Sequence, residues 1–225
     1  MKIELLMYQV VLEFDREKPH IVSWWWGHCA SVIDVIESQG AYQIIGIVDK
    51  EEFKGQQLLG YNYIGEDKDL PDLISKFKNV VITLGMIKSN TLRVKLFNLT
   101  KSLGANFPVI KSPSAHVSRY SKISPGTVVM HHAIVNSHSK IGENCIINTK
   151  ALIEHDCIIG NHCHMSTAAT VNGSCTIGDN VMIGSNSVLL NGVKVISNTI
   201  IGAGGVVVKN VDVAGTLVGN PAKTL

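Results

Sequence analysis

One apolar residue recurs at every sixth position through the C-terminal half of the chain. The series starts at Val117, passes Ile147 and Ile177, and ends at Val213, and all seventeen members are apolar. The residue two positions before each member is almost always small. A period of six matches neither the 3.6 residues of a helical turn nor the two-residue alternation of a hairpin strand. The chain from residue 112 onward is therefore expected to coil through short flat faces, with one hexad for each face.

The glycine spacing indicates how many faces make one coil. Gly142, Gly160 and Gly178 lie 18 residues apart, as do Gly184 and Gly202. Glycine suits the corners, because a backbone without Cβ turns most easily there. Three hexads make 18 residues, so the pattern predicts triangular coils that stack as parallel strands about 4.8 Å apart.

The residues before the hexads alternate between strand and helix patterns. The expected strands cover residues 20–23, 42–48, 80–84 and 107–110, and the expected helices cover residues 30–39, 71–77 and 90–103. The sequence thus predicts a small Rossmann-like α/β domain over residues 20–111 and an all-β domain of parallel β-helix with a C-terminal tail over 112–225. Residues 1–19 are expected to form an extension that is either disordered or an edge strand.

The expected turn into the first helix has an unusual composition. Trp24–Trp26 stand directly before Gly27 and His28, and Asp49 follows at the end of the second strand. Open α/β sheets bind ligands at such turns. Three tryptophans do not let a phosphate approach the backbone as glycines do, so phosphate binding here is expected to be weak.

Composition excludes several classes of function. The charged fraction is 17% and the formal net charge is +2, which does not favour a nucleic-acid partner. No apolar run reaches the ~20 residues that cross a bilayer, and the N-terminus lacks the order of a signal peptide, so a cytoplasmic protein without a membrane partner is expected. The five cysteines include no C-x-x-C pair. Four of them occupy the small hexad position, so they are expected to pack in the core and to bind no metal.

The stretch IEHDCIIG at 153–160 is the most specific of a set of short segments spread from about residue 20 to the end. The others are Gly27-His28, residues 47–49, 82–85, 114–115, 147–149, 164–166 and 218–223. Together these segments resemble the sialic acid O-acetyltransferase and bacillosamine-pathway sugar N-acetyltransferase family, a group of hexapeptide-repeat acyltransferases. The resemblance implies a left-handed β-helix, acetyl-CoA as co-substrate, a sugar acceptor and a homotrimer.

His155 is the candidate catalytic base. Acetyl transfer from a thioester needs a group that takes a proton from the attacking amine or hydroxyl, and the pKa of free histidine lies near neutrality. His155 follows the inward Ile153 by two residues and has the small neighbours Ser137 and Gly173 one coil away on either side. In the resembling family the matching histidine is the base, and the following carboxylate, here Asp156, raises its basicity.

The resemblance also implies two sets of binding residues. The acetyl-CoA side is expected at His164, Gly173, Ser185 and Ala203. The acceptor side is expected at Gly27, His28, Asp49, Gly85 and Asn148.

Two other functions are compatible with the same repeats. A metalloenzyme of the γ-carbonic anhydrase type would need three converging ligands, for which His155, His162 and His164 are candidates by sequence proximity. A catalytically impaired sugar-binding or scaffold protein would keep the β-helix without transfer. Among acetyltransferases, N-acetylation of a nucleotide-linked amino sugar and O-acetylation of a sialic acid both stay open.

Overall fold

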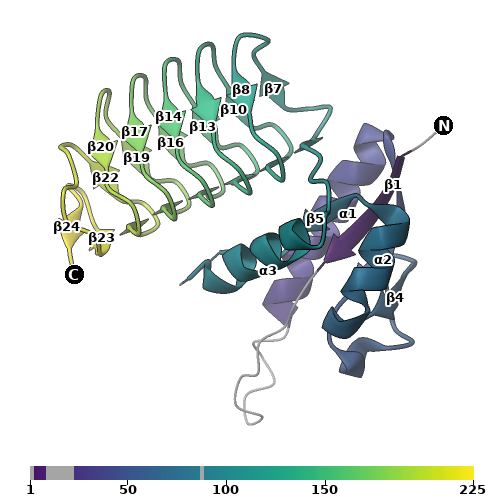
Figure 1. The fold of residues 1–225 in the computed structure, drawn as a ribbon. Helices are drawn as coiled ribbons and strands as arrows, with labels where there is room; N and C mark the ends of the chain where they lie inside the picture. The colour runs from purple at the N-terminus through teal and green to yellow at the C-terminus, as the bar shows by residue number, and fades with distance from the viewer. Residues whose placement is uncertain (1–2, 9–22, 87–88) are drawn as a thin grey trace. The chain divides into compact units, whose positions relative to one another are not determined.

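The computed structural model describes residues 3–8, 23–86 and 89–225, and these form two compact units (Figure 1). The first unit contains the described residues up to Gly85 together with Thr91–Pro108. The second contains Met86–Asn90 and Val109–Leu225. A short stretch between two elements of the first unit thus belongs to the second.

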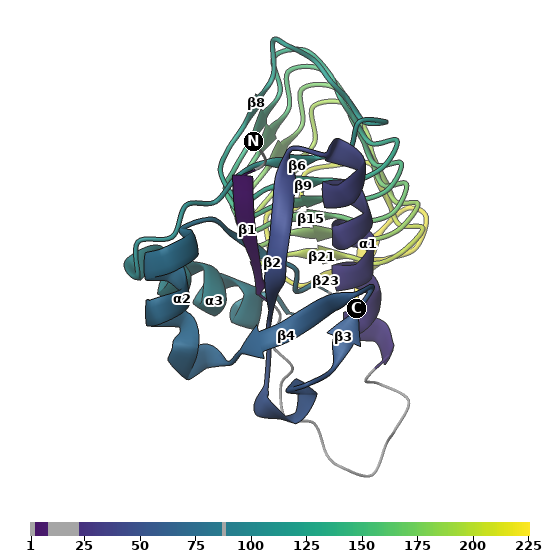
Figure 2. The same cartoon turned by 90° about the vertical axis from the view of Figure 1, so that its right-hand side faces the viewer.

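The first unit is a mainly parallel sheet with helices on both faces. The strand order is β3-β4-β2-β1-β5, and only β3 runs antiparallel to its neighbour. Figure 2 shows α1 on one face and α2 and α3 on the other. The bounds are β1 Ile3–Tyr8, α1 Ser23–Gln39, β2 Tyr42–Val48, β3 Gln57–Leu58, β4 Tyr61–Gly65, α2 Leu70–Phe77, β5 Val80–Ile82 and α3 Thr91–Ser102, with 3-10 turns at Glu51–Phe53 and Asp67–Asp69.

The sequence reading of this unit is confirmed in its middle and wrong at its ends. The strand at 42–48 has the expected bounds, and three helices lie near their expected places. The extension at 1–19, expected to be disordered or an edge strand, instead contains β1 at Ile3–Tyr8, which lies inside the sheet between β2 and β5. The predicted strand at 20–23 is wrong at Ser23, which already begins α1, and its other residues lie outside the described chain. The predicted turn at 24–28 is helical for the same reason.

Packing against neighbours explains why β1 escaped the sequence reading. Its six residues, IELLMY, are apolar almost throughout rather than alternating, as is typical of an interior parallel strand that is covered on both faces. Met7 is fully buried. The predicted strand at 107–110 is also wrong for this sheet, because only Ile110 is in a strand and it pairs with Val128 of the second unit.

The second unit is a parallel β-helix of three sheets. The first sheet contains β7 His116–Val117, β10 Ile134–Val135, β13 Leu152–Ile153, β16 Thr170–Val171, β19 Val188–Leu189 and β22 Val206–Val207. The second contains β8 Lys122–Ile123, β11 Lys140–Ile141, β14 Ile158–Ile159, β17 Thr176–Ile177 and β20 Lys194–Val195. The third, seen in Figure 2, contains β6 Ile110–Lys111, β9 Val128–Val129, β12 Ile146–Ile147, β15 His164–Met165, β18 Met182–Ile183, β21 Ile200–Ile201, β23 Thr216–Val218 and β24 Lys223–Thr224.

The 18-residue coil predicted from the glycines is confirmed by the pairing register. Ile134 pairs with Leu152, and Leu152 with Thr170, each 18 residues further along. The inward aliphatic residues and the four hexad cysteines form one continuous core. The series is wrong at its last member, because Val213 is 74% exposed.

The final coil is shorter than the others, which explains the exposure of Val213. Ile200 pairs with Thr216, only 16 residues on, and Val195 bridges to Val211. The inward place that six-residue counting gives to Val213 is therefore taken by Val211, which is 7% exposed.

Each corner from residue 126 to residue 204 is a two-residue turn whose second residue has positive φ. From Asn144 onward this residue donates its backbone N–H to the first turn residue of the coil below, as Asp156 does to the Ser137 carbonyl at 3.0 Å. The left-handed conformation aims the N–H along the coil axis and so satisfies it. Asn, Asp, His and Gly tolerate this conformation best and predominate in the series Gly126, His132, His138, Asn144, Lys150, Asp156, His162, Ala168, Ser174, Asn180, Asn186, Gly192, Asn198 and Gly204.

The glycine column at another corner leaves space for side chains of the next coil. Asn161 Oδ1 accepts a hydrogen bond from the Glu143 N–H at 2.8 Å, and Asp179 Oδ1 accepts one from the Asn161 N–H at 2.6 Å. A Cβ on Gly160 would lie 2.4 Å from Asp179 Oδ1 and 2.6 Å from the backbone carbon of Gly178. Glycine is required here by close approach between coils.

We expect Gly160→Ala to lower the free energy of unfolding by about 1–3 kcal/mol, because the added methyl overlaps backbone that cannot move away. Gly192→Asn is the matched control. Gly192 has φ of +72° and open space around its Cα, and asparagine tolerates this conformation. Urea unfolding followed by circular dichroism measures both variants. Equal stability of the two would contradict the close-packing account of the column.

Candidate active site

His155 and Asp156 occupy one corner of the second unit, in the turn between β13 and β14. The His155 Nδ1 atom lies 2.7 Å from Asp156 Oδ2, and both side chains are more than half exposed. A carboxylate only accepts hydrogen bonds, so Nδ1 carries the proton and donates it. In the neutral ring the Nε2 atom then keeps its lone pair, which is the form that a general base requires.

The coils above and below hold the backbone of His155 in place. Its carbonyl accepts a hydrogen bond from the Ser174 N–H at 2.9 Å, and the Asp156 N–H donates to Ser137. Asp156 has φ of 59°, which follows from the corner geometry. The turn thus brings two adjacent side chains together on a rigid frame, as a catalytic pair needs.

Gly173 gives the imidazole its space. A Cβ at this position would lie 2.7 Å from His155 Cε1 and 2.8 Å from Nε2. The side-chain amide nitrogen of Asn191 would lie 3.3 Å from this same Cβ. The ring of His155 therefore rests over the glycine of the next coil, and any side chain there would displace it.

His164 lies on the third sheet and is only 7% exposed. Its Nδ1 atom lies 2.9 Å from the Met86 carbonyl, which can only accept, so this nitrogen carries the proton. Its Nε2 atom accepts from the Asn148 amide at 3.1 Å. Asn148 is held in this orientation because its Oδ1 accepts the Thr149 N–H at 2.8 Å.

The stretch Met86–Asn90 is bound to the same sheet by a second side chain. Asn90 donates to the His162 carbonyl at 3.0 Å and to Asn180 Oδ1 at 2.8 Å. The structure thus joins the expected residues Asn148 and His164 through one hydrogen bond. Ser185 and Ala203, also expected on the acetyl-CoA side, follow on later coils and are half-buried and exposed.

The expected acceptor residues of the first unit fall into one neighbourhood. The nearest approach of a Cβ on Gly85 would be to the His28 ring, at 4.0 Å. Asp49 is 1% exposed, and its Oδ1 accepts the Lys50 N–H at 2.8 Å. Its charge adds to the effect of burial in raising the pKa of Cys29, the residue next to His28, to about 12. Gly27 is exposed in the first turns of α1.

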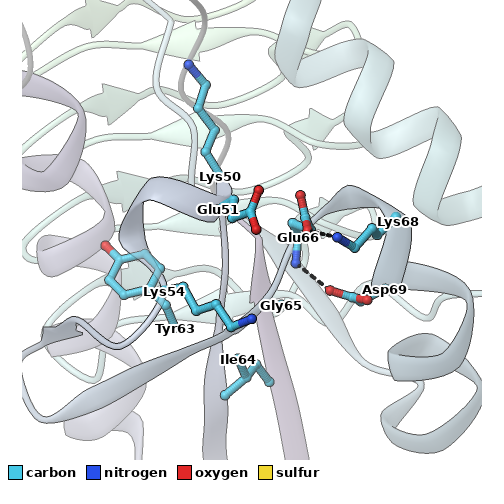
Figure 3. A pocket seen from close by; sticks show the side chains of 9 residues that line it. All are labelled: Lys50, Glu51, Lys54, Tyr63, Ile64, Gly65, Glu66, Lys68 and Asp69. Carbon is cyan, nitrogen blue, oxygen red and sulfur yellow. Dashed lines mark hydrogen bonds and ion pairs between the residues drawn. The ribbon is translucent and has the colours of Figure 1, made fainter.

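A pocket of about 300 Å³ that the sequence reading missed opens at the carboxyl ends of β2 and β4 (Figure 3). Ligands of open α/β sheets bind at this edge. Lys68 pairs with Glu66, whose N–H donates to Asp69. The sequence feature that could have located this pocket is Asp49-Lys50, which stands directly after β2. The pocket is lined by Lys50, Glu51, Lys54, Tyr63, Ile64, Gly65, Glu66, Lys68 and Asp69.

The histidines considered for zinc do not converge. His155 is at the corner after β13, His164 is bonded to Asn148, and His162 Nδ1 lies 3.0 Å from the Asn144 amide. Within residues 3–8, 23–86 and 89–225, no three His, Cys, Asp or Glu side chains form a group that could hold a metal ion. In that same part of the chain, no helix is long and apolar enough to span a membrane.

Several known proteins are similar to this chain in sequence and structure. Residues 27–99 match the family model described as the PglD N-terminal domain. PerB from Caulobacter crescentus, solved with CoA and GDP-perosamine, is 29% identical, with 97% of this chain and 95% of that chain covered and a TM-score of 0.83. The acetyltransferase domain of PglB from Neisseria gonorrhoeae, solved with acetyl coenzyme A, is 26% identical over the full length of both chains, with a TM-score of 0.84. These matches confirm the resemblance of the chain to the hexapeptide-repeat sugar acetyltransferases.

A third solved structure is also similar to this chain. WeeI from Acinetobacter baumannii is 24% identical over the full length of both chains, with a TM-score of 0.79, and shares the fold. Comparison with curated protein sequences gave no match. The expected fold class of the hexapeptide-repeat acyltransferases, an α/β domain followed by a left-handed parallel β-helix, is confirmed.

The cysteines of this chain are expected to be unreactive in the folded protein. All five are buried and free. Burial raises the pKa of Cys29 to about 12, whereas the hydrogen bond with Cys157 lowers the pKa of Cys175 to about 7. Because a buried thiol is out of reach of the reagent whatever its pKa, titration with a chromogenic disulfide at pH 8 should detect almost no thiol in the native protein and five in guanidinium. Rapid reaction of even one native cysteine would contradict this description.

Proposed function

We propose that the chain transfers the acetyl group of acetyl-CoA to the amino group of a nucleotide-linked sugar, with His155 as the general base. The observation that supports this most is the His155–Asp156 pair, because it leaves one imidazole nitrogen unprotonated and exposed beside a glycine. The two similar structures add the substrate class, since PerB holds CoA with GDP-perosamine and the PglB domain holds acetyl coenzyme A.

The reaction proceeds by direct transfer in a ternary complex. The acceptor nitrogen attacks the thioester carbonyl while His155 Nε2 takes its proton, so a carbon–nitrogen bond forms as the carbon–sulfur bond breaks. Asp156 stabilises the imidazolium through Nδ1–H. The proton then passes to the departing thiolate, which leaves as the CoA thiol. No cysteine is required.

The binding residues are assigned to the two substrates by their place in the fold. His164, Gly173, Ser185 and Ala203 are proposed on the acetyl-CoA side, on coils from His164 toward the C-terminus. Asn148 is proposed on the acceptor side, where the fixed amide of its side chain can be shared with the substrate.

The first unit is proposed to hold the nucleotide portion of the acceptor. Gly27, His28, Asp49 and Gly85 are proposed to contact it at the carboxyl edge of the sheet. The neighbouring pocket adds the ammonium groups of Lys50 and Lys54, which suit the charge of a phosphate, while Lys68 in the same lining is paired with Glu66. No metal is part of this proposal.

We further propose a cytoplasmic homotrimer. Apolar side chains point outward along the first sheet of the β-helix: Ile134 is 37% exposed, and Leu152, Val188 and Val206 are partly exposed. A flat apolar stripe of this kind is typical of a protein interface. Sedimentation at micromolar concentration measures the assembly.

The acceptor class is tested by thiol release from acetyl-CoA. We expect release with GDP-perosamine or with a UDP-linked amino sugar, and none with free sialic acid, and mass spectrometry of the product identifies an N-acetyl group. Transfer to sialic acid alone would replace the N-acetylation proposal by O-acetylation. Absence of transfer to all three acceptors would favour a sugar-binding or scaffold protein.

His155→Ala should lower kcat by about 10²–10⁴, the usual contribution of a general base. The exposed position of His155 predicts an unchanged melting temperature. His116→Ala removes another exposed histidine, from β7, and is the control that should retain activity. Activity of His155→Ala within a few-fold of the parent would exclude the imidazole as the base.

A further inference from the structure

Three side chains with no role in the core stand on the N-terminal side of His155, along the same corner of the β-helix. Counting by 18 places Tyr120, His138 and Asp156 one above another as second turn residues. Arg119, the residue before Tyr120, occupies the same turn position as His155, two coils earlier. Tyr120 is 57% exposed, and Arg119 and His138 are exposed as well.

The three side chains are ordered with respect to one another. The rings of Tyr120 and His138 stack with centroids 6.1 Å apart and an angle of 15° between their planes. The guanidinium carbon of Arg119 lies 4.7 Å from the centroid of the Tyr120 ring, and its Nη2 donates to the Tyr120 hydroxyl. Two nearly parallel rings and a cation thus form one surface, here called the aromatic step (Arg119, Tyr120 and His138).

The corner turn does not require these side chains. Asparagine or glycine satisfies the positive φ of 63° at His138 equally well, as they do at other corners. An exposed stacked pair of rings with an arginine at its edge matches a ligand that is flat and apolar on one face and anionic at one end.

We propose that the aromatic step is an acceptor subsite, which takes the pyranose ring of the sugar on Tyr120 and His138 and a phosphate oxygen on Arg119. This inference rests on the proposed function. A pyranose presents a face of C–H bonds that stacks on aromatic rings, and the phosphate at its anomeric carbon carries the charge that arginine pairs with.

The spacing of the coils agrees with this assignment. Successive coils are about 4.8 Å apart, so the turn of Tyr120 is about 10 Å from the turn of His155. A sugar on the step can therefore direct an amine at the far side of its ring toward the imidazole.

The opposite side of His155 suits the other substrate. Gly173 and Asn191 continue the corner there with little bulk around the ring. The acceptor then approaches His155 from the N-terminal coils and the thioester from the C-terminal coils.

Steady-state kinetics with the acceptor that the wild type acetylates tests the inference. Tyr120→Ala should raise KM for this acceptor by about 3- to 10-fold, the factor that a stacked ring contributes, and leave KM for acetyl-CoA unchanged. Tyr120→Phe retains the ring and should restore most of the lost affinity. Arg119→Gln should raise the acceptor KM in the same direction.

A matched pair of variants controls for effects of the turn itself. His138→Asn removes a ring of the step, whereas His132→Asn makes the same change at an exposed corner residue of nearly equal φ, 57°, outside the step. We expect a raised acceptor KM only in His138→Asn, with melting temperatures of the two variants alike. Equal effects of the pair, or an unchanged acceptor KM in Tyr120→Ala, would overturn the aromatic step while leaving the proposed function intact.

Two further outcomes have defined meanings. A rise in KM for acetyl-CoA in Tyr120→Ala would assign the step to the coenzyme and would overturn its role for the acceptor. A wild type that transfers acetyl groups to no acceptor would refute the proposed function itself, and with it the subsite.

Discussion

The in-register stacking of 18-residue coils is the constraint on which the rest of this structure depends. Every strand of the β-helix is two or three residues long, far too short to be stable by itself, and gains its hydrogen bonds only from the coils above and below. The same register turns sequence spacing into spatial columns. Ser137, His155, Gly173 and Asn191 are neighbours because they are 18 residues apart, and the chemistry of the corner follows from that geometry.

Side chains with functional groups lie at the corners of the coil, because the inward positions of the flat faces do not tolerate them. Inward positions must be apolar and the preceding positions small, whereas the corner asks only for a residue that accepts positive φ at its second place. Histidine, aspartate and asparagine meet that demand and also bear functional groups. Asp156 meets three requirements at once. It adopts the positive φ of the turn, donates its N–H to the coil below and orients the imidazole of His155.

The α/β unit depends on packing that is less local. Arg93 of α3 is 2% exposed and donates from Nη1 to the carbonyls of Ile82 and Leu84, at 2.6 and 2.7 Å. Ile82 ends β5, and Leu84 stands directly before Gly85. A buried arginine thereby shapes the edge of the sheet where the proposed acceptor residues lie, and its position in the sequence gives no sign of this role. The stretch Met86–Asn90 that follows is bound to the β-helix unit by His164 and Asn90.

The sequence by itself determined the β-helix, its coil length and the exposed place of His155, because a strict period of six leaves one way to bury every sixth side chain. It also located the strand at 42–48, where the apolar pattern is strong. Three features became known only from the tertiary structure: residues 3–8 form a strand inside the sheet, Val211 replaces Val213 in the last coil, and a pocket opens beside Lys50. Those features depend on contacts between segments that are far apart in the sequence. The pattern of neighbouring residues contains no information about such contacts.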